Sequence, residues 1–295
     1  MDFAVANAYD AAMLAATKAV ATPAHVQIKV FDANNSSTTQ YSQLQDVISS
    51  GQYQGIILQP IFGTALIPLV KQAIAKGIKV VNIDQILGPN LNTAQPQVPG
   101  LSGNASFIPQ EDGVRAGHLV IQACQAHHFN PCQVGYMYDV KASALDGAER
   151  TGFDQTIASM PSIKVVAQGE SNFTQSGGLK AAQDMLQAHP GINVFTGADQ
   201  GIEGATQAAA AAGKSSVVLI GGGGGSIALA NVKSKKWFGE VWSAPATEGK
   251  TGMQMLVKAL QTGATSGGVD VIAGFPNNGE ITQSNVGQYT AQYTG

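Results

Sequence analysis

A run of five glycines at 221–225 is the segment of this sequence best suited to bind a phosphate or another anion. It follows an apolar strand pattern and precedes a helix pattern, so its backbone amides could surround a negative charge. The G-x-G-x-x-G motif is not completed, because positions 226 and 227 are Ser and Ile. The alternative is a flexible turn that leaves room for a larger ligand. GKS at 213–215 predicts no phosphate loop, because position 208 is Ala and the segment follows a helix.

Catalytic and metal-binding motifs are missing from the sequence. There is no G-x-S-x-G and no H-E-x-x-H, and neither cysteine has an acid-oriented histidine near it in the sequence. The five histidines show no ligand spacing, and His127 and His128 adjoin on a predicted loop. We therefore expect no enzymatic activity, no metal and no cofactor. An enzyme whose groups converge from distant segments is the alternative that we rank last.

The two cysteines, Cys124 and Cys132, lie eight positions apart, across a predicted helix end, a turn and a strand start. A disulfide between them would stabilise the fold by roughly 2 to 3 kcal/mol in the chain-entropy model, and it would require an oxidising compartment. Two unrelated buried thiols in a cytosolic protein are the alternative. The sequence favours the disulfide.

Composition indicates a soluble globular protein without affinity for nucleic acid. Apolar residues make up 44% of the chain and charged residues 12%, and the net charge is -3. A chain of this charge offers no basic face for a phosphate backbone. No apolar run reaches the roughly 18 residues that a membrane span needs, and Asp2 stands where a signal peptide would carry a basic residue.

Two stretches repeat one pattern of apolar strand, polar loop, helix stopped by a glycine, and second strand. They run from 55 to 84 and from 192 to 222. With 295 residues, the chain exceeds what one hydrophobic core usually covers. The pair of patterns predicts two α/β lobes, in which ligands bind where strand ends meet helix starts. We therefore expect a ligand site between the lobes.

Strand and helix patterns alternate along the chain, as a parallel sheet with crossover helices requires. A stretch rich in Pro, Asn and Gln at 87–100 interrupts the alternation and places a linker near 105. The predicted elements are helix 8–21, strand 26–31, helix 38–50, strand 55–59, a helix from 64 to its stop at 77, strand 78–83, helix 111–126, strand 133–138, helix 144–159, strand 163–167, helix 176–188, strand 192–196, helix 201–212, strand 216–221, helix 226–233, strand 237–242, helix 247–262, and strands 269–273 and 280–283.

Four segments, in this order, resemble the sugar-binding branch of the type I periplasmic binding proteins, which includes the ribose- and galactose-binding proteins of bacterial ABC transporters. They are GIILQPIFGTALIPLVKQAIAKGIKVVNID, RTGFDQTIASMPSIKVVAQGE, GLKAAQDMLQAHPGINVFTGAD and ITQSNV. The resemblance covers nearly the whole chain. It implies an α/β fold of two Rossmann-like lobes, each a parallel sheet flanked by helices, joined by a three-stranded hinge that closes on a ligand. The first lobe would comprise 1–107 and 244–270, and the second 108–243 and 271–295.

The resemblance also implies ligand positions. Asn7 and Tyr9 match an Asn and an aromatic ring that touch the sugar, and Asp10 follows where many relatives have a second aromatic residue. Asp84 matches an Asp that accepts hydrogen bonds from hydroxyl groups, and Phe173 matches an aromatic wall of the other lobe. Members of the family open with a full strand, whereas only 1–6 are left for it here. Either that strand is short, or an upstream strand, a signal and a lipid anchor precede Met1.

Other positions depart from the pattern of ribose binders. Gln85 and Glu149 stand where those proteins have Arg, Ala198 where they have Asn, Gly223 where they have Asp, and Ser243 where they have Gln. The loss of two arginines predicts a site that offers mainly acceptors. Such a site suits a polyol, an unusual sugar or an amine-bearing molecule.

Aromatic stacking faces would come from Trp242 and from Tyr136 or Tyr138, since alternate strand residues face opposite sides of a sheet. The alternative for all three is a place in the core.

The acidic positions have structural alternatives as well. Asp84 could cap a turn, and Glu149 could pair with Arg150 on a solvated helix. Asp199 is predicted to be a helix cap rather than a ligand residue.

We therefore expect a monomeric solute-binding protein that captures a small polar molecule and presents its closed form to the membrane permease of an ABC transporter. It would be periplasmic or extracellular, with a lipid anchor as a variant. The alternative from another class is the ligand-sensing core of a lac-repressor-like transcription regulator without its DNA-binding headpiece. Reduced thiols at Cys124 and Cys132 would favour the regulator.

Overall fold

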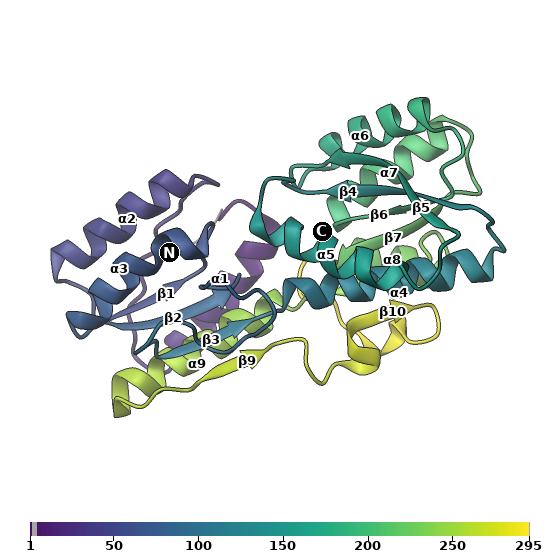
Figure 1. Cartoon of the computed structure of the whole chain (residues 1–295). Coiled ribbons are helices and arrows are strands. Elements are labelled where there is room, and N and C mark those ends of the chain that lie inside the picture. Colours follow the sequence, from purple (N-terminus) through teal and green to yellow (C-terminus); the bar gives the residue numbers. More distant parts are fainter. Residues whose placement is uncertain (2–4, 295) are drawn as a thin grey trace. The chain divides into compact units, whose positions relative to one another are not determined.

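The computed structural model describes residue 1 and residues 5–294. Contacts within the chain divide it into two compact units, which are described separately below (Figure 1). Unit 1 comprises Met1–Ile108 and Ala244–Val271, and unit 2 comprises Pro109–Ser243 and Ile272–Gly295. The chain therefore passes between the units three times.

The secondary structure of unit 1 consists of α1 (Ala8–Ala21), α2 (Ser37–Ser50), β1 (Gly55–Leu58), α3 (Gly63–Ala75), β2 (Lys79–Asp84), β3 (Gly103–Ser106), α9 (Pro245–Thr262) and β9 (Gly268–Asp270). The strands form one parallel sheet in the order β1-β2-β3-β9. In Figure 1, α2 and α3 run beside each other, and α1 runs beside α9. The end of β2 carries Asp84 and Gln85, which the sequence analysis marks for ligand contact.

Strand alternation in β2 gives the sheet of unit 1 two apolar faces. Val80 belongs to a buried cluster with Leu44 of α2 and Leu66 of α3. Val81 and Ile83 point to the other side of the sheet, toward α9. A Cβ atom added to Gly252 of α9 would lie 2.3 Å from Cγ2 of Ile83 and 3.8 Å from Cγ1 of Val81. Successive side chains of a strand face opposite sides of the sheet, so apolar residues at consecutive positions require helices on both faces.

Close packing of α9 on α1 fixes the place of the first helix. A Cβ atom at Gly249 would lie 2.1 Å from the backbone oxygen of Met13, so only glycine fits at this contact. The hydroxyl of Thr17 lies 3.2 Å from the backbone oxygen of Gly249 and donates to it. These contacts orient the amino-terminal end of α1, which carries Tyr9 and Asp10.

One strand prediction for unit 1 was wrong. No strand is assigned at 26–31, although the segment alternates apolar and polar residues. A hollow of about 480 Å³ lies between that segment and β1, and within the described chain residues 27–30 make no backbone hydrogen bonds to other backbone groups. The amino group of Met1 donates to the backbone oxygen of Ile57 in β1, and the backbone oxygen of Met1 accepts from the amide of Gln59. Of the strand expected at 1–6, residues 2–4 lie outside the described residues.

The strand β3 was not predicted. Its sequence, GNAS, contains no large apolar residue, yet all four residues are buried. Side chains compensate for the polar composition, because Asn82 Nδ2 donates to Asn104 Oδ1 at 2.6 Å and Asn104 Nδ2 donates to Ser106 Oγ at 2.8 Å. Buried polar groups that are hydrogen-bonded in this way can replace apolar packing.

The secondary structure of unit 2 consists of α4 (Pro109–Ala126), β4 (Cys132–Tyr138), α5 (Ala144–Ile157), β5 (Ile163–Glu170), α6 (Gln175–Ala188), β6 (Val194–Thr196), α7 (Asp199–Ala211), β7 (Val218–Gly223), α8 (Ser226–Lys233), β8 (Gly239–Trp242), β10 (Glu280–Thr282) and the short 3₁₀ turns Pro276–Gly279 and Val286–Gln288. The sheet order is β10-β8-β7-β6-β4-β5. All neighbours are parallel except β10, which runs antiparallel to β8.

The core of unit 2 lies between this sheet and the pair α4 and α5. Phe153 of α5 and Leu119 of α4 pack on Val134 and Val194 in one buried cluster. The two helices approach closely, because a Cβ atom at Gly152 would lie 2.0 Å from the backbone oxygen of Gln110. This contact holds the first turns of α5 near the end of β4.

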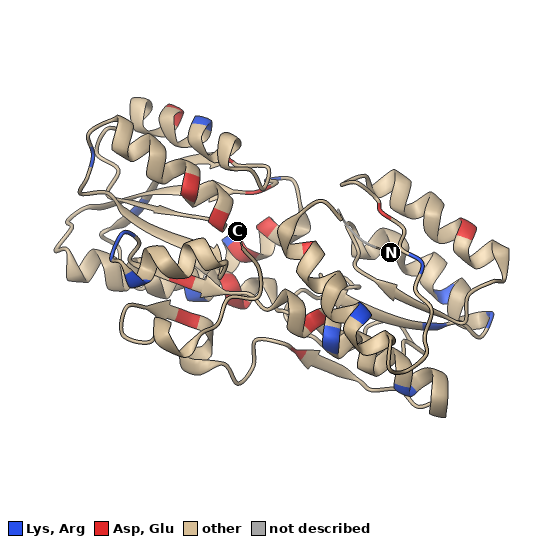
Figure 2. Cartoon of the chain, turned by 180° about the vertical axis from the view of Figure 1, so that it is seen from behind, with Lys and Arg blue, Asp and Glu red and all other residues tan. Residues whose placement is uncertain are grey.

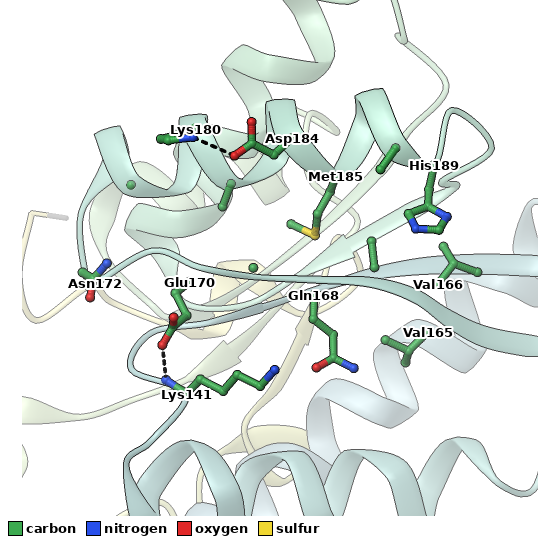
Figure 3. A pocket seen from close by; sticks show the side chains of 15 residues that line it. Lys141, Val165, Val166, Gln168, Glu170, Asn172, Lys180, Asp184, Met185 and His189 are labelled. Atoms are coloured by element: carbon green, nitrogen blue, oxygen red, sulfur yellow. Dashed lines mark hydrogen bonds and ion pairs between the residues drawn. The ribbon is translucent and has the colours of Figure 1, made fainter.

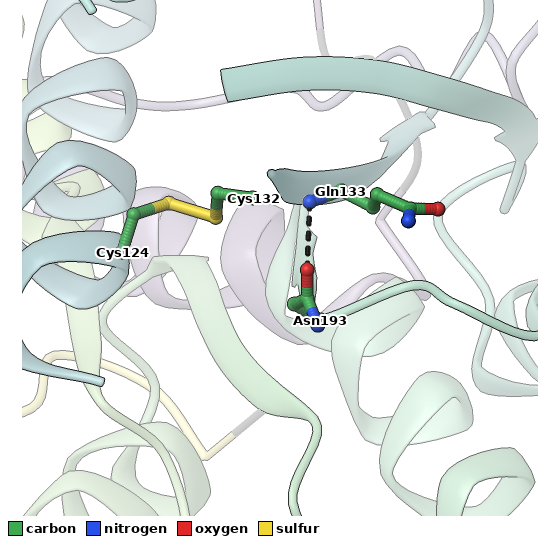
Figure 4. Close-up of a disulfide and its surroundings, with 4 residues drawn as sticks. All are labelled: Cys124, Cys132, Gln133 and Asn193. Carbon is green, nitrogen blue, oxygen red and sulfur yellow. Dashed lines mark hydrogen bonds between the residues drawn. A yellow bond between two sulfur atoms is a disulfide. The ribbon is translucent and has the colours of Figure 1, made fainter. Parts of the chain in front are cut away.

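A disulfide joins Cys124 of α4 to Cys132 of β4, with a Cα–Cα distance of 5.9 Å (Figure 4). The predicted pairing is therefore confirmed. Beside it, the backbone amide of Gln133 donates to Oδ1 of Asn193 at 2.8 Å, which ties the start of β4 to the segment before β6.

Replacing both cysteines by serine should lower the free energy of unfolding by about 2 to 3 kcal/mol, because the cross-link restricts the unfolded chain. Urea denaturation of the oxidised protein and of the Cys124→Ser, Cys132→Ser variant measures the difference. Wild-type protein kept in a thiol reductant is the matched control and should unfold at the midpoint of the variant. Equal midpoints for oxidised wild type and variant would contradict the expectation.

Charge is sparse and mixed in sign. Figure 2 shows acidic and basic residues scattered over the helices and loops of both units. None of the helices in the described residues is long and apolar enough to cross a membrane.

Candidate functional site

The carboxyl ends of β1 and β2 carry a polar network in unit 1. Nε2 of Gln59, one residue beyond β1, donates to Oδ1 of Asp10 at 2.6 Å and to Oδ2 of Asp84 at 3.0 Å. The hydroxyl of Tyr9 lies 3.3 Å from Oδ1 of Asp84 and 3.4 Å from Oε2 of Glu248. One amide and one phenol thus serve three carboxylates, all of which are buried. The network is rich in acceptors.

Local backbone geometry explains how Asp84 reaches this network. The residue ends β2 with φ of 65°, in the left-handed region that Asp and Asn tolerate better than most residues. Asn7 lies one residue before α1, and its side chain accepts a hydrogen bond from the amide of Tyr9 at 2.8 Å. Asn7 is therefore a helix cap in this structure, and its contact with a ligand stays a prediction.

Only part of the network was named in the sequence analysis. Tyr9, Asp10 and Asp84 were candidates, whereas Gln59 and Glu248 were not. A signal for Gln59 was present, because it directly follows the apolar strand GIIL. Glu248 lies far away in the sequence and reaches the network only because α9 packs on α1. Gln85 is half-buried, and its backbone oxygen accepts from Asn82 Nδ2 at 2.7 Å.

Unit 2 has its own acidic set at the end of β4. Burial raises the pKa of Asp139 to about 7, while the hydrogen bond from Ser171 Oγ, 2.6 Å long, acts in the opposite direction. The pKa of Glu149 is raised well above its ordinary value by burial and then by Asp146 and Asp112. Asp146 accepts from the amides of Asp139 and Val140, at 2.8 and 3.1 Å.

Glu149 differs from these neighbours in its partners. Its carboxyl group accepts no hydrogen bond from the part of the chain that the structure describes, whereas the carboxyl groups of Asp139 and Asp146 each accept hydrogen bonds. The predicted alternative, a pair with Arg150, does not form, because Nε of Arg150 donates to Oδ1 of Asp154 at 2.8 Å. A half-buried carboxyl group without a partner can take a donor from a ligand.

Arg150 lies against the two tyrosines that were candidates for stacking. Its guanidinium carbon is 4.9 Å from the ring centre of Tyr136 and 5.9 Å from that of Tyr138. Nη1 donates to the hydroxyl of Tyr138 at 3.1 Å. Both rings are buried and contact each other, because residues two positions apart on a strand face the same side of the sheet. The expectation that alternation along β4 separates the two rings was therefore wrong.

The remaining candidates of unit 2 surround the end of β7. Trp242 is 1% exposed, and its ring packs on Tyr289 and Phe275 with centroid distances of 5.0 and 5.5 Å. Ser243 is half-buried, and its amide donates to the oxygen of Gly223 at 3.2 Å. The ring of Trp242 thus lies in an aromatic cluster of the core, as the alternative to ligand stacking in the sequence analysis stated. A contact between Trp242 and a ligand stays a prediction.

Two further candidates have other environments. Phe173 is half-buried on the loop before α6, with φ of 53°. Asp199 was predicted to be a helix cap, and this is wrong, because the residue before α7 is Ala198. Asp199 instead accepts hydrogen bonds from the amide of Gly225 at 2.9 Å and from the hydroxyl of Tyr293 at 3.1 Å.

A groove of about 740 Å³ lies along β5 and α6, on the edge of the sheet of unit 2 (Figure 3). Lys180 and Asp184 lie one turn apart on α6 and pair at 2.8 Å along one side of the groove, and Glu170 accepts from the amide of Lys141 at 2.7 Å. None of the predicted ligand residues lines the groove. Within residues 1 and 5–294, no group of three or more His, Cys, Asp or Glu side chains is placed to hold a metal ion.

Residues 4–265 match the model of a family described as periplasmic binding protein domain. The chain belongs to this family. The resemblance stated in the sequence analysis is therefore confirmed, as is its consequence that the protein is a binding protein rather than an enzyme.

Curated relatives of this periplasmic binding protein have sugar-related names. The ribose import binding protein RbsB of Bacillus subtilis (strain 168) is 25% identical over 226 residues, which cover 76% of this chain and 68% of that protein. The D-allose-binding periplasmic protein of Escherichia coli (strain K12) is 27% identical over 252 residues, which cover 81% and 76% of the two chains.

Solved structures confirm the fold of two α/β lobes. An ABC transporter solute-binding protein from Mycobacterium smegmatis with bound glycerol has a TM-score of 0.80 at 22% identity, covering 97% of this chain and 94% of that chain. One from Bacillus halodurans C-125 with bound myo-inositol has a TM-score of 0.80 at 21% identity, covering 98% and 95%.

Proposed function

We propose that this periplasmic binding protein is the solute-binding protein of an ABC transporter, that its ligand is a sugar or a polyol, and that it delivers the ligand to a membrane permease from the outer side of that membrane. The family supports the first part. The named relatives of ribose and allose transport, together with a xylitol-binding protein of Mycolicibacterium smegmatis that is 28% identical over 179 residues, support the ligand class. The disulfide agrees with an oxidising compartment rather than with a cytosolic regulator.

The acceptor network of unit 1 is the observation that carries the proposal. Asp84 and Asp10 share one amide donor, and Tyr9 serves Asp84 and Glu248. A carboxylate accepts hydrogen bonds at about four positions, and hydroxyl groups of a ligand are donors of the matching kind. Polyols and furanose or pyranose sugars present several such hydroxyls on adjacent carbons. Donation to Asp84 is the contact that we assign first.

The acidic and aromatic set of unit 2 would contact the same ligand. Glu149 is half-buried and makes no hydrogen bond to the described residues of its own unit, and the guanidinium of Arg150 lies on the ring of Tyr136. We assign Glu149 a hydroxyl donor and Arg150 a ring or hydroxyl oxygen of the ligand. With Arg150, unit 2 offers donors as well as acceptors, which suits a sugar better than the site of mainly acceptors inferred from the loss of two arginines.

Thermal-shift measurements against ribose, allose, arabinose, xylitol, myo-inositol and glycerol, followed by calorimetry on the best ligand, test this function. A ligand that binds only the folded state raises its stability by RT ln(1 + [L]/Kd), about 2.7 kcal/mol at 100 times Kd. At least one sugar or polyol should therefore raise the melting temperature in proportion to the logarithm of its concentration. If only diamines and polyamines in a second panel do so, the ligand class is wrong.

A further inference from the structure

Two buried carboxyl groups meet beneath the glycine run of unit 2. Asp199 begins α7 and is 1% exposed, and Glu240 lies in β8 and is 0% exposed. Oδ2 of Asp199 accepts from the amide of Gly225 and the hydroxyl of Tyr293, and Oε1 of Glu240 accepts from the amide of Gly224 at 2.9 Å. One oxygen of each carboxyl group is thus bound to the chain that follows β7.

The other two oxygens face each other. A Cβ atom at Gly221 would lie 2.2 Å from Oε2 of Glu240 and 3.0 Å from Oδ1 of Asp199, so both oxygens occupy the same small space. Neither has a donor within the described residues. Two ionised carboxylates that share such a space would repel each other strongly when buried. A single proton turns one of the two groups into a hydrogen-bond donor for the other.

We propose that Asp199 and Glu240 hold one proton between Oδ1 and Oε2, and that this pair positions the Gly223–Gly225 turn for ligand binding. The second clause rests on the function proposed above. Gly223 and Gly224 have φ of 146° and 80°, which only glycine adopts readily, so the conformation of the turn needs support from its surroundings. The backbone oxygen of Gly223 also accepts a hydrogen bond from the amide of Ser243, a candidate ligand residue. Asp199 and Glu240 are positioning residues in this account and do not touch the ligand.

The surroundings of the pair favour the protonated form. Glu203, Asp139 and Tyr293 are the other titratable groups that interact with it, and all three are acids. Burial, and then Asp199, raises the pKa of Glu240 well above its ordinary value, and burial raises the pKa of Asp199. In the unfolded chain both groups titrate near pH 4.

The sign of the pH dependence follows from these shifts. A carboxyl group whose pKa is higher in the folded state stabilises the fold below its unfolded pKa, and this stabilisation is lost as the pH rises through the folded pKa. The protein should therefore lose stability, and then affinity for its ligand, on the alkaline side. If binding requires the proton, the affinity falls by up to about tenfold per pH unit.

Carbon-13 NMR of protein labelled at the glutamate side-chain carboxyl tests the shared proton without any ligand. The resonance that disappears in Glu240→Gln should titrate far above pH 4 in wild type. A Glu240 resonance that titrates in the ordinary range of glutamate would overturn the proposal. The titration is measured on wild type, so it tests the shared proton even if Glu240→Gln folds poorly. In that case Asp199→Asn assigns the Glu240 resonance, because removing the neighbouring acid shifts its frequency.

Ligand affinity measured from about pH 6 to about pH 10 tests the positioning role. Glutamine can donate to Asp199 and accept from Gly224 at every pH, so Glu240→Gln should bind like wild type at neutral pH and keep its affinity where wild type loses it. Asp184→Asn, a change at an exposed acid, should follow wild type throughout. Equal alkaline losses in wild type and Glu240→Gln would overturn the positioning role. Failure of every sugar and polyol to bind would instead refute the proposed function and leave the NMR result standing.

Discussion

The Asp84→Asn variant should bind the ligand about 100-fold more weakly than wild type. Asparagine has nearly the same shape and tolerates the φ of 65° at this position, so the backbone should stay in place. The charge is lost, however, and hydrogen bonds to charged groups contribute about 1.5 to 3 kcal/mol each. A ligand that donates to Asp84 loses that amount, and Gln59 and Tyr9 lose a charged acceptor as well.

Calorimetry at one pH measures the effect. The control is Asp184→Asn, the same substitution at an exposed aspartate that pairs with Lys180. The control should bind within twofold of wild type. The double variant Asp84→Asn, Glu149→Gln should bind more weakly than either single variant if both units contact one ligand. Wild-type affinity in Asp84→Asn, with the control unchanged, would remove Asp84 from the site.

Replacing Trp242 by alanine should lower the free energy of unfolding by about 3 to 5 kcal/mol, the range for a large buried aromatic side chain. Its ring is 1% exposed and packs on Tyr289 and Phe275, and its edge fills the space beside Gly224. Trp242→Phe should cost less than about 2 kcal/mol, because phenylalanine keeps the ring contacts and removes an indole N–H that has no acceptor in the described structure.

Chemical denaturation of both variants at the same pH gives these values. Trp242 was a candidate for ligand stacking, and the pair of variants separates that role from packing. A ring that only packs should leave the affinity of Trp242→Phe within a few-fold of wild type. Unchanged stability in Trp242→Ala would contradict the core position of the ring.

Much of the fold could be predicted because its elements have regular patterns. The helix at 226–233 was predicted with the bounds that the structure has, and most other elements agree within two or three residues. The strand β3 escaped prediction because side-chain amides of Asn82 and Asn104 replace the apolar residues that normally mark a strand. The strand predicted at 26–31 shows the converse, since its alternating pattern pairs with no strand of the described residues.

The candidate site was predictable only in part. Asp84 and Asp10 follow predicted elements and could be named, whereas Glu248 joins them only through the packing of α9 on α1. The partner of Arg150 was within reach of prediction, because Asp154 lies four residues further along the helix, whereas adjacent residues such as Glu149 do not face each other. Asp199 begins α7, directly after β6, whereas Glu240 lies in β8, and the order β6-β7-β8 in the sheet brings them together.

The most direct test of the account is a crystal structure of the protein with the sugar or polyol that binds best. The account predicts one ligand molecule that donates hydroxyl hydrogen bonds to Asp84 of unit 1 and also contacts Glu149 or Arg150 of unit 2. A ligand held by one unit alone, or bound in the groove along β5 and α6, would contradict it.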